Sequence, residues 1–325
     1  MISRRNILSL SASAAAVSLA PRAFAQQPWP QRPVTIICPF AAGGNTDGIA
    51  RMAAQRMTEA YGVSVNVENR PGAGGAVAAD YVAKSAPDGH TLLIGALPVM
   101  AIVPAMQTVR YDSIKDFAPV SNIATNPFAL VVNKDLPIKT LADFVAYVKE
   151  RPDKLSYSSA GIGSLNHLSM ALFLKRAGLQ MAHVPYRGNA PALADVVAGH
   201  VPAMFSNLSD AVPQINGGAV RLLAVSSETR SALAPDAPTV AESGYPGFNV
   251  LTWNGLLAPA KTPTAIIDKI ADTMSAAIKD EAFKKQLADY GVDPLAARPA
   301  EFAAMLKQDM VTWKEAVELA GVKQQ

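Results

Sequence analysis

Short apolar, β-branched runs alternate with helix-like stretches along almost the whole chain. Residues 34–38, 91–95 and 128–132 are rich in Val, Ile and Leu, as strands are. Residues 47–61 repeat apolar side chains with helical spacing, and residues 141–150 form a helix-like stretch after Thr140, which is a suitable N-cap. Alternation of this kind predicts an α/β fold with largely parallel sheets and helices on both sheet faces.

The second half of the chain continues the same alternation. Strand-like residues 155–158 precede a predicted helix over 164–177, and residues 183–186 precede one over 191–198. Two long helical patterns close the chain, at 263–290 with a break near Asp280 and at 299–319.

Four of the predicted strand-to-helix junctions share a small, Gly-rich composition with few acidic residues. They cover residues 39–47, 68–75, 158–164 and 185–191. Glycine lets the backbone come close to a ligand, and the first N–H groups of a helix lack internal partners. Open α/β sheets bind ligands at the carboxyl ends of their strands, where these junctions lie. Together the junctions predict a cradle for an anion, although any single one could be an ordinary α/β loop.

Enzyme motifs fit this chain poorly. The sequence contains no G-x-x-x-x-G-K-[ST] phosphate loop, and GAGGAV at residues 72–77 fails the dinucleotide fingerprint at its last position. The four histidines, His90, His167, His183 and His200, lack metal-ligand spacing, so we expect neither a metal nor a cofactor. One enzyme alternative stays open, a secreted serine hydrolase that uses Ser158 or Ser159 with His167.

The N-terminus has the three regions of a secretory signal. A basic segment with Arg4 and Arg5 precedes an uncharged apolar stretch over residues 7–20, and Ala23-Phe24-Ala25 suits signal peptidase. We therefore expect cleavage after Ala25 and a periplasmic protein. The paired arginines leave both the general secretory and the twin-arginine export routes open.

Charge and cysteine content narrow the function further. The full chain carries 29 Lys+Arg and 26 Asp+Glu, and the signal removes Arg4, Arg5 and Arg22 and no acid. The mature chain, residues 26–325, is thus balanced at 26 of each sign, which argues against a nucleic-acid partner. Cys38 is the only cysteine, so an internal disulfide is impossible, and its apolar surroundings predict a buried residue.

Several motifs together resemble one family, the receptors of tripartite tricarboxylate transporters, also called the Bug family. The matching segments are PVTIICPFAAGGNTD at 33–47, ENRPGAGG at 68–75, APDGHTLL at 86–93, HVPYRG at 183–188, PTVAESGYP at 238–246 and WNGL at 253–256. Matches extend over essentially the whole mature chain and are specific in combination.

The resemblance implies a two-lobed periplasmic-binding-protein fold of type II, an α/β fold with a central ligand cleft. Lobe one is expected to comprise residues 26–124 and 254–325, and lobe two residues 125–253. The implied function is that of a solute receptor, not an enzyme, which captures a small organic carboxylate and delivers it to a membrane transporter of the tripartite type. The protein is expected to act as a monomer. A sensor that serves a signalling partner is the alternative, and the identity of the carboxylate stays open.

The family's binding roles transfer to residues in both lobes. In lobe one they are Phe40, Ala41, Ala42, Thr46, Ala73, Gly74 and Gly75. In lobe two they are Ser158, Ser159, Gly163, Ser164, His167, Tyr186, Asn207 and Asp210. The chain departs from the family pattern at Ala171, where Glu is common, and at Pro202, where Asp is common. The first departure affects either polarity near the cleft or only a helix face, and the second is expected to be structural.

Overall fold

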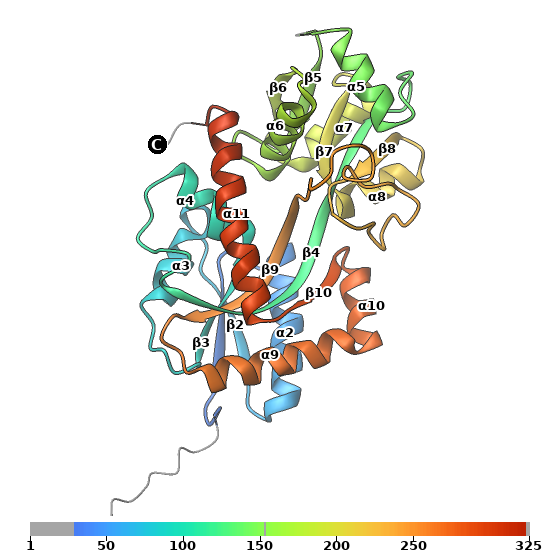
Figure 1. Cartoon of the computed structure of the whole chain (residues 1–325). Helices are drawn as coiled ribbons and strands as arrows, with labels where there is room; N and C mark the ends of the chain where they lie inside the picture. Colours follow the sequence, from blue (N-terminus) through green and yellow to red (C-terminus); the bar gives the residue numbers. More distant parts are fainter. Residues whose placement is uncertain (1–28, 153, 323–325) are drawn as a thin grey trace, which may run out of the picture.

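The computed structural model describes residues 29–152 and 154–322, and these residues form two α/β lobes (Figure 1). The expected signal and its cleavage site lie outside them. Strands of both lobes belong to one continuous sheet. Its strand order is β2 (Val65–Asn69), β1 (Val34–Cys38), β3 (Thr91–Ala96), β9 (Leu251–Pro259), β4 (Phe117–Asn133), β7 (Ala203–Asn207), β5 (Ser156–Ser159) and β6 (Ala182–Pro185), while β8 (Val220–Val225) and β10 (Asp293–Ala297) pair with β4. The predicted α/β fold with two lobes is confirmed, while the residue numbers at which the lobes divide stay a prediction.

The first lobe is built on a parallel core in which β1 lies between β2 and β3. Helices cover its two faces (Figure 1). Its first elements are β1 (Val34–Cys38), α2 (Asn45–Tyr61), β2 (Val65–Asn69), the short turn η2 (Ala73–Gly75), α3 (Ala76–Ala83), β3 (Thr91–Ala96), η3 (Pro98–Ile102) and α4 (Val103–Met106). Cys38 is fully buried in β1, as the sequence predicts.

Two long strands join the lobes. β4 (Phe117–Asn133) pairs first with β9 (Leu251–Pro259) and then with β7 and β8, and all three pairings are antiparallel. The prediction of largely parallel sheets is therefore wrong at the centre of the molecule, because the chain enters and leaves the second lobe on neighbouring antiparallel strands. Buried Ser121, Asn122 and Asn126 interrupt the apolar pattern of β4, so the sequence indicated only its last part.

The second lobe, like the first, contains parallel strands at the edge of the sheet and helices on both faces of the sheet. β5 pairs in parallel with β6 and β7. Its elements are α5 (Leu141–Lys149), β5 (Ser156–Ser159), α6 (Leu165–Ala177), β6 (Ala182–Pro185), α7 (Asn189–Ala198), β7 (Ala203–Asn207), α8 (Leu208–Asn216) and β8 (Val220–Val225). Thr140 is the N-cap of α5, as predicted, and the structure adds a capping box in which Thr140 and Asp143 bond reciprocally.

The C-terminal segment returns to the first lobe and then runs along both. It contains α9 (Thr264–Lys279), α10 (Glu281–Asp289), β10 (Asp293–Ala297) and α11 (Pro299–Leu319). The predicted break at Asp280 is confirmed, since its side chain accepts a hydrogen bond from the Phe283 N–H and caps α10.

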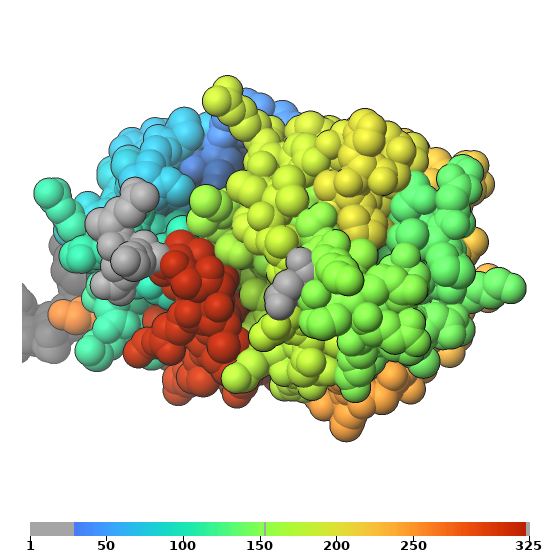
Figure 2. Space-filling view, turned by 90° about the horizontal axis from the view of Figure 1, so that it is seen from above, coloured from blue at the N-terminus to red at the C-terminus, as the bar shows by residue number. Residues whose placement is uncertain are grey.

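α11 packs on η3 of the first lobe, on the linking strand β4 and on α6 of the second lobe. Seen from above, its last turns lie against both the first lobe and the green residues of the second (Figure 2). The Trp253 Nε1–H donates to Asp309 Oδ2 at 2.7 Å and ties α11 to β9, while burial raises the pKa of Asp309 to about 7. Within the described ranges, none of the helices combines the length and apolar character that a membrane crossing requires.

Candidate functional site

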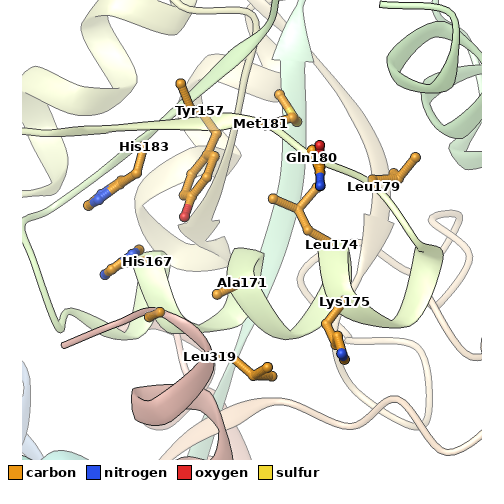
Figure 3. A pocket seen from close by; sticks show the side chains of 12 residues that line it. Tyr157, His167, Ala171, Leu174, Lys175, Leu179, Gln180, Met181, His183 and Leu319 are labelled. Carbon is orange, nitrogen blue, oxygen red and sulfur yellow. The ribbon is translucent and has the colours of Figure 1, made fainter. Parts of the chain in front are cut away.

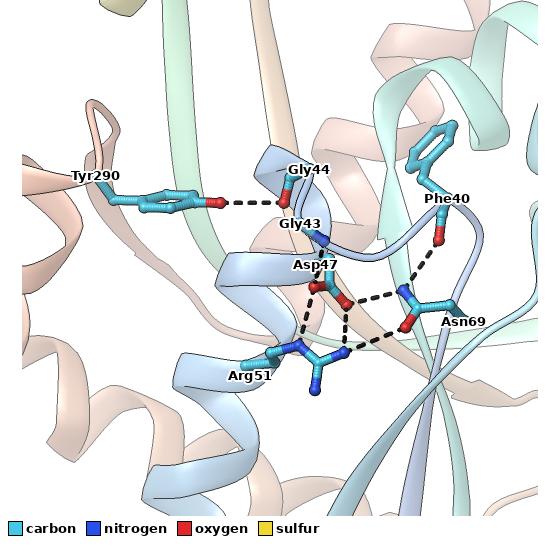
Figure 4. A network of polar contacts seen from close by, with 7 residues as sticks. All are labelled: Phe40, Gly43, Gly44, Asp47, Arg51, Asn69 and Tyr290. Carbon is cyan, nitrogen blue, oxygen red and sulfur yellow. Dashed lines mark hydrogen bonds and ion pairs between the residues drawn. The ribbon is translucent and has the colours of Figure 1, made fainter.

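The first junction, Phe40–Gly44, is held in shape by a buried carboxylate in the first turn of α2 (Figure 4). Asp47 accepts two hydrogen bonds from the Arg51 guanidinium, at 2.9 and 3.0 Å. It also accepts the Gly43 N–H at 2.9 Å, and Asn69 Nδ2 donates to Asp47 at 2.8 Å and to the Phe40 carbonyl at 3.0 Å. The loop is therefore anchored at both ends by side chains from α2 and β2.

This network also sets the electrostatics of the junction. Chiefly the Arg51 hydrogen bonds lower the pKa of Asp47 to about 2, so that Asp47 is ionised and its charge is offset by Arg51. No side chain caps the N-terminus of α2, which begins after Gly44. The first N–H groups of α2 therefore have no capping side chain, and the helix dipole favours a negative charge near them.

Two contacts from the C-terminal half of the chain support the same helix start. Asn254 Nδ2, on β9, donates to Thr46 Oγ1 at 2.9 Å in a buried position, and the Tyr290 hydroxyl donates to the Gly44 carbonyl at 3.0 Å. A Cβ added at Gly48 would lie 2.2 Å from the Tyr290 hydroxyl oxygen, so glycine is needed for this contact. Tyr290, Arg51 and Asn69 were not among the predicted site residues. Only the fold brings Tyr290 to the junction, whereas Arg51 lies one helical turn after Asp47 and Asn69 lies in the second Gly-rich junction, so helical spacing and the motif could have indicated both.

The second junction has a backbone that most residues cannot adopt. Gly72, Ala73, Gly74 and Gly75 all have positive φ angles, of 144°, 46°, 64° and 99°. Ala73 is the exception among them because it carries a side chain, and such strained positions cluster at functional sites. A Cβ added at Gly75 would lie 2.5 Å from Val99 Cγ2, so this loop is packed tightly against the rest of the lobe. α3 begins directly after Gly75 without a side-chain cap.

The third junction lies in the second lobe and is built from hydroxyls and two imidazoles. Ser159 Oγ is 2.6 Å from His183 Nε2, and the Gly161 N–H donates to the same hydroxyl at 3.1 Å. The Gly163 N–H donates to His167 Nδ1 at 3.1 Å, and Ser164 caps α6 through the His167 N–H. Ser158 is fully buried and its hydroxyl donates to the Ala192 carbonyl of α7, on the other face of the sheet.

His167 and His183 are stacked, which their separation in sequence did not indicate. Their ring centroids are 3.8 Å apart with an angle of 5° between the planes. Burial, together with the neighbouring His183, lowers the pKa of His167 to about 4, and burial lowers the pKa of His183. Both rings are therefore uncharged at neutral pH. Among the described residues no group of three or more His, Cys, Asp or Glu side chains could hold a metal ion.

The serine hydrolase alternative fails on the geometry of these side chains. Ser159 pairs with His183, and the pairing with His167 that the alternative required is not formed. Among the described residues, no carboxylate is hydrogen-bonded to His183. The acid of a Ser-His-acid triad is therefore missing at Ser159 and His183.

The fourth junction joins α7 to α8 through amides and one carboxylate. Asn189 Nδ2 donates to Asp210 Oδ2 at 2.8 Å, and Asn207 Nδ2 approaches the same oxygen at 3.4 Å. Tyr186 bonds through its hydroxyl to Asp195 of α7. Asn189 was not among the predicted site residues, although it lies within the fourth predicted junction, residues 185–191.

Each predicted site residue therefore lies at a strand-to-helix junction, but not all present a free side chain there. The Ser158 and Tyr186 hydroxyls are engaged by α7, whereas Ala41, Ala42 and Gly43 are exposed. A ligand-binding role for the full set stays a prediction. The Pro202 carbonyl, just before β7, accepts the Asn133 N–H, a backbone bond that any residue could make, so the structural role of Pro202 stays a prediction.

Two α/β lobes joined by antiparallel strands, with Gly-rich loops before uncapped helices, define the class of two-lobed solute-binding proteins. Residues 49–322 match the model of the tripartite tricarboxylate transporter family receptor, and the chain belongs to this family. It is a solute-binding receptor of the periplasmic-binding-protein type, and the family consists of binding proteins rather than enzymes.

Curated and solved relatives cover most of the chain. It is 37% identical over 317 residues to a UPF0065 protein from the tcbD-tcbE intergenic region of Pseudomonas sp. strain P51, covering 97% of this chain and 94% of that protein. The Rpa4515 protein of R. palustris, solved with adipate, is 36% identical with a TM-score of 0.73, covering 90% of this chain and 99% of that one. MatC of Rhodopseudomonas palustris, solved with bound malate, is 35% identical with a TM-score of 0.68, covering 89% and 100%.

A more distant relative has the more similar backbone arrangement. A TctC solute-binding protein from Polaromonas, solved with no ligand, is 26% identical but has a TM-score of 0.83, covering 90% of this chain and 99% of that one.

Proposed function

We propose that this receptor captures a small organic carboxylate between its lobes and delivers it, as a monomer in the periplasm, to a membrane transporter of the tripartite type. The observation that carries the proposal is the pair of uncapped helix N-termini at α2 and α3, each preceded by a loop whose backbone is fixed by packing or hydrogen bonds. Relatives solved with adipate and malate support the same class of ligand.

Backbone N–H groups can supply enough affinity without an arginine that contacts the ligand. A hydrogen bond to a charged group contributes roughly 1.5–3 kcal/mol, and the helix dipole adds about 0.3–1 kcal/mol. A few such bonds, less the cost of association, reach the roughly −8 kcal/mol of a micromolar complex. Because the loops are already ordered by Asp47 and by the packing of Gly75, little conformational entropy is lost when the ligand binds.

The arrangement of the two lobes is similar to that of a relative solved without ligand. Its TM-score is higher with the relative solved without ligand than with those solved with adipate or malate, although those are more similar in sequence. In the proposed cycle, the ligand first meets the helix N-termini of the first lobe, and the second lobe then closes on it through the Ser159–Ser164 loop.

A thermal-shift experiment with mono-, di- and tricarboxylates tests carboxylate capture. A ligand that binds the folded state at one hundred times its Kd stabilises it by about 2.7 kcal/mol, so a true ligand raises the Tm by several degrees. A Tm that no carboxylate changes, together with native mass spectra that show no ligand on the purified protein, would contradict the proposal.

Delivery to a transporter is tested in cells that lack the gene. Loss of carboxylate uptake is expected, with normal induction of the uptake genes. Intact uptake with lost induction would instead show that the receptor serves a signalling partner.

A further inference from the structure

The middle of α11 is fastened to the two strands that link the lobes. Trp253 of β9 lies opposite Thr125 of β4 and is buried. Phe302 of α11 packs edge-on against the Trp253 ring with centroids 5.0 Å apart, and the Trp253 Nε1–H donates to Asp309 of the same helix at 2.7 Å. Because Phe302 and Asp309 are about two helical turns apart, the two contacts fix both the position and the direction of α11 on the linking strands.

Beyond Asp309, α11 continues along the second lobe as one helix (Figure 1). Leu319, in its last turn, lies on the side of α6 from which Lys175 projects (Figure 3). Val322 follows the helix and reaches the third Gly-rich junction, where a Cβ added at Gly163 would lie 3.8 Å from Val322 Cγ1. A rotation of the second lobe about the linking strands therefore changes the packing of α6 against the second half of α11.

This packing is incomplete. A cavity of about 430 Å³ separates the second half of α11 from α6 and from residues 247–250. Asp309 and Glu315 line it on the α11 side, and Lys175 and Arg176 line it on the α6 side. Packed elements normally leave no gap of this size between them, so α6 has room to move toward α11 or away from it.

The Asp309 carboxyl lacks a compensating charge in this arrangement. Burial raises its pKa to about 7, against the lowering effect of the Trp253 hydrogen bond. The linking strands β4 and β9 contain no ionisable side chain, and neither do residues 247–250. About half of the Asp309 carboxyls are therefore protonated at neutral pH.

The charged groups nearest to Asp309 line the same cavity. Lys175 and Arg176 are exposed on α6, and neither is among the groups that shift the pKa of Asp309. Arg176 instead donates to the Pro246 carbonyl at 3.2 Å. Glu315, the second carboxylate of the cavity wall, is exposed. Two cations thus face the buried carboxyl across the cavity without pairing with it.

Movement of α6 in either direction favours the ionised form of Asp309. Movement toward α11 narrows the cavity and brings Lys175 and Arg176 closer, and an opposite charge within about 4–6 Å favours a charged carboxylate. Movement away opens the cavity to water, which also favours the charged form. The protonated form therefore belongs to the arrangement of the lobes described here, which is similar to that of a relative solved without ligand.

We propose that α11 is a strap across the linking strands, and that the receptor releases a proton from Asp309 when its lobes close on a carboxylate. The released proton passes to the solvent. Since binding then competes with protonation of Asp309, the affinity for the carboxylate rises as the pH rises from 6 to 8. This inference rests on the proposed capture of a carboxylate between the lobes.

Calorimetric titration in two buffers of different ionisation enthalpy measures the proton released on binding. The probes are adipate, malate and the acid of the thermal-shift panel that raises the Tm most. At pH 7 the wild type is expected to release about half a proton per bound acid, because a group with a pKa of about 7 is half protonated there. Its affinity is expected to be about fivefold higher at pH 8 than at pH 6.

Asp309→Asn has nearly the same shape, keeps an acceptor for the Trp253 Nε1–H and does not titrate. It should release no such proton and should bind at pH 8 about as weakly as the wild type does at pH 6. Glu315→Gln is the matched control, because it removes the exposed carboxylate of the same helix and cavity wall, and it should keep the proton release. Trp253→Phe removes the hydrogen bond that lowers the pKa of Asp309, so it should move the proton release to higher pH, which a merely structural role of Asp309 would not do.

Thermal unfolding without ligand provides an independent measurement. The folded protein holds the Asp309 proton more tightly than the unfolded chain, in which the pKa of Asp is about 3.9. The Tm of the wild type should therefore fall by a few degrees relative to that of Asp309→Asn as the pH rises from 5 to 8. A Tm difference that does not vary with pH would overturn the inference.

The binding experiment separates this inference from the proposed function. Carboxylate binding without proton release, or with the same release in the wild type and in Asp309→Asn, would overturn the role of Asp309 and leave carboxylate capture intact. Failure of adipate, malate and the whole panel to bind would overturn the proposed function, and the coupling with it.

Discussion

The first junction of lobe one and the third junction of lobe two look alike in sequence but are built by opposite means. In lobe one, the ionised pair of Asp47 and Arg51 fixes a loop whose own residues are small and exposed. In lobe two, neutral rings and hydroxyls hold the loop, with His183 on Ser159 and His167 on Gly163. In the proposed capture of a carboxylate, lobe one would present ordered backbone N–H groups to the anion, and lobe two would present uncharged side chains to the rest of the ligand.

The largest effect is expected where the lobe-one loops depend on packing. Gly75→Ala forces a side chain into a positive φ angle of 99° and places its Cβ 2.5 Å from Val99 Cγ2. Strain and overpacking together should lower the free energy of unfolding by about 2–5 kcal/mol, measured by urea denaturation.

Gly62→Ala is the matched control for this change, because Gly62 also has a positive φ angle, of 67°, but nothing lies within 4 Å of its Cβ position. Its cost should be confined to the backbone strain of about 1 kcal/mol. Equal costs for the two variants would show that the second junction is not tightly packed.

The histidine stack of lobe two predicts a loss of stability in acid. The pKa of His167 is about 4 in the folded protein and about 6.5 in the unfolded chain. The unfolded chain therefore binds more protons between these values, so the contribution of His167 is complete above pH 6.5 and is lost as the pH falls toward 4.

His167→Gln keeps an acceptor for the Gly163 N–H and does not titrate in this range. The difference in unfolding free energy between wild type and variant should fall by about 1–3 kcal/mol from pH 7 to pH 4. Asp309 contributes with the opposite sign in both proteins and cancels in this difference. A difference that does not vary with pH would contradict the buried, neutral stack.

An effect of similar size is expected from the charged network of lobe one. Asp47→Asn removes the charge that Arg51 pairs with and one of the two acceptor oxygens, and should cost about 1–3 kcal/mol because the charge-assisted hydrogen bonds to this buried side chain are weakened or lost. Asp289→Asn disrupts the exposed pair with Lys285 and should cost less than about 1 kcal/mol. Thermal unfolding of both variants measures the contrast, and an equal loss would mean that Asp47 does not order the loop.

Much of the fold was predictable because periodicity and loop composition are local signals. The break at Asp280, the cap at Thr140 and the last helix over residues 299–319 all follow from neighbouring residues. The long β4 did not, because polar residues such as Asn122 and Asn126 are buried in it and hide its extent.

The site was predictable only as a set of junctions. Glycines and family motifs located the loops, but the residues that shape them come from distant parts of the chain. Asn254 reaches Thr46 across 208 positions, Tyr290 reaches Gly44 across 246, and the two stacked histidines lie on different elements. Contacts over such separations depend on the tertiary fold, which no local pattern encodes.

Calorimetric titration of two variants at Ala42 tests the central claim most directly, once the thermal-shift panel has given a ligand. Ala42 is exposed in the first Gly-rich loop, so Ala42→Asp places a negative charge beside the N-terminus of α2, while Ala42→Asn has nearly the same shape without the charge. If a carboxylate binds there, Ala42→Asp should weaken binding by about tenfold or more and Ala42→Asn should bind much as the wild type does. Equal affinities of the two variants would contradict anion capture by this helix.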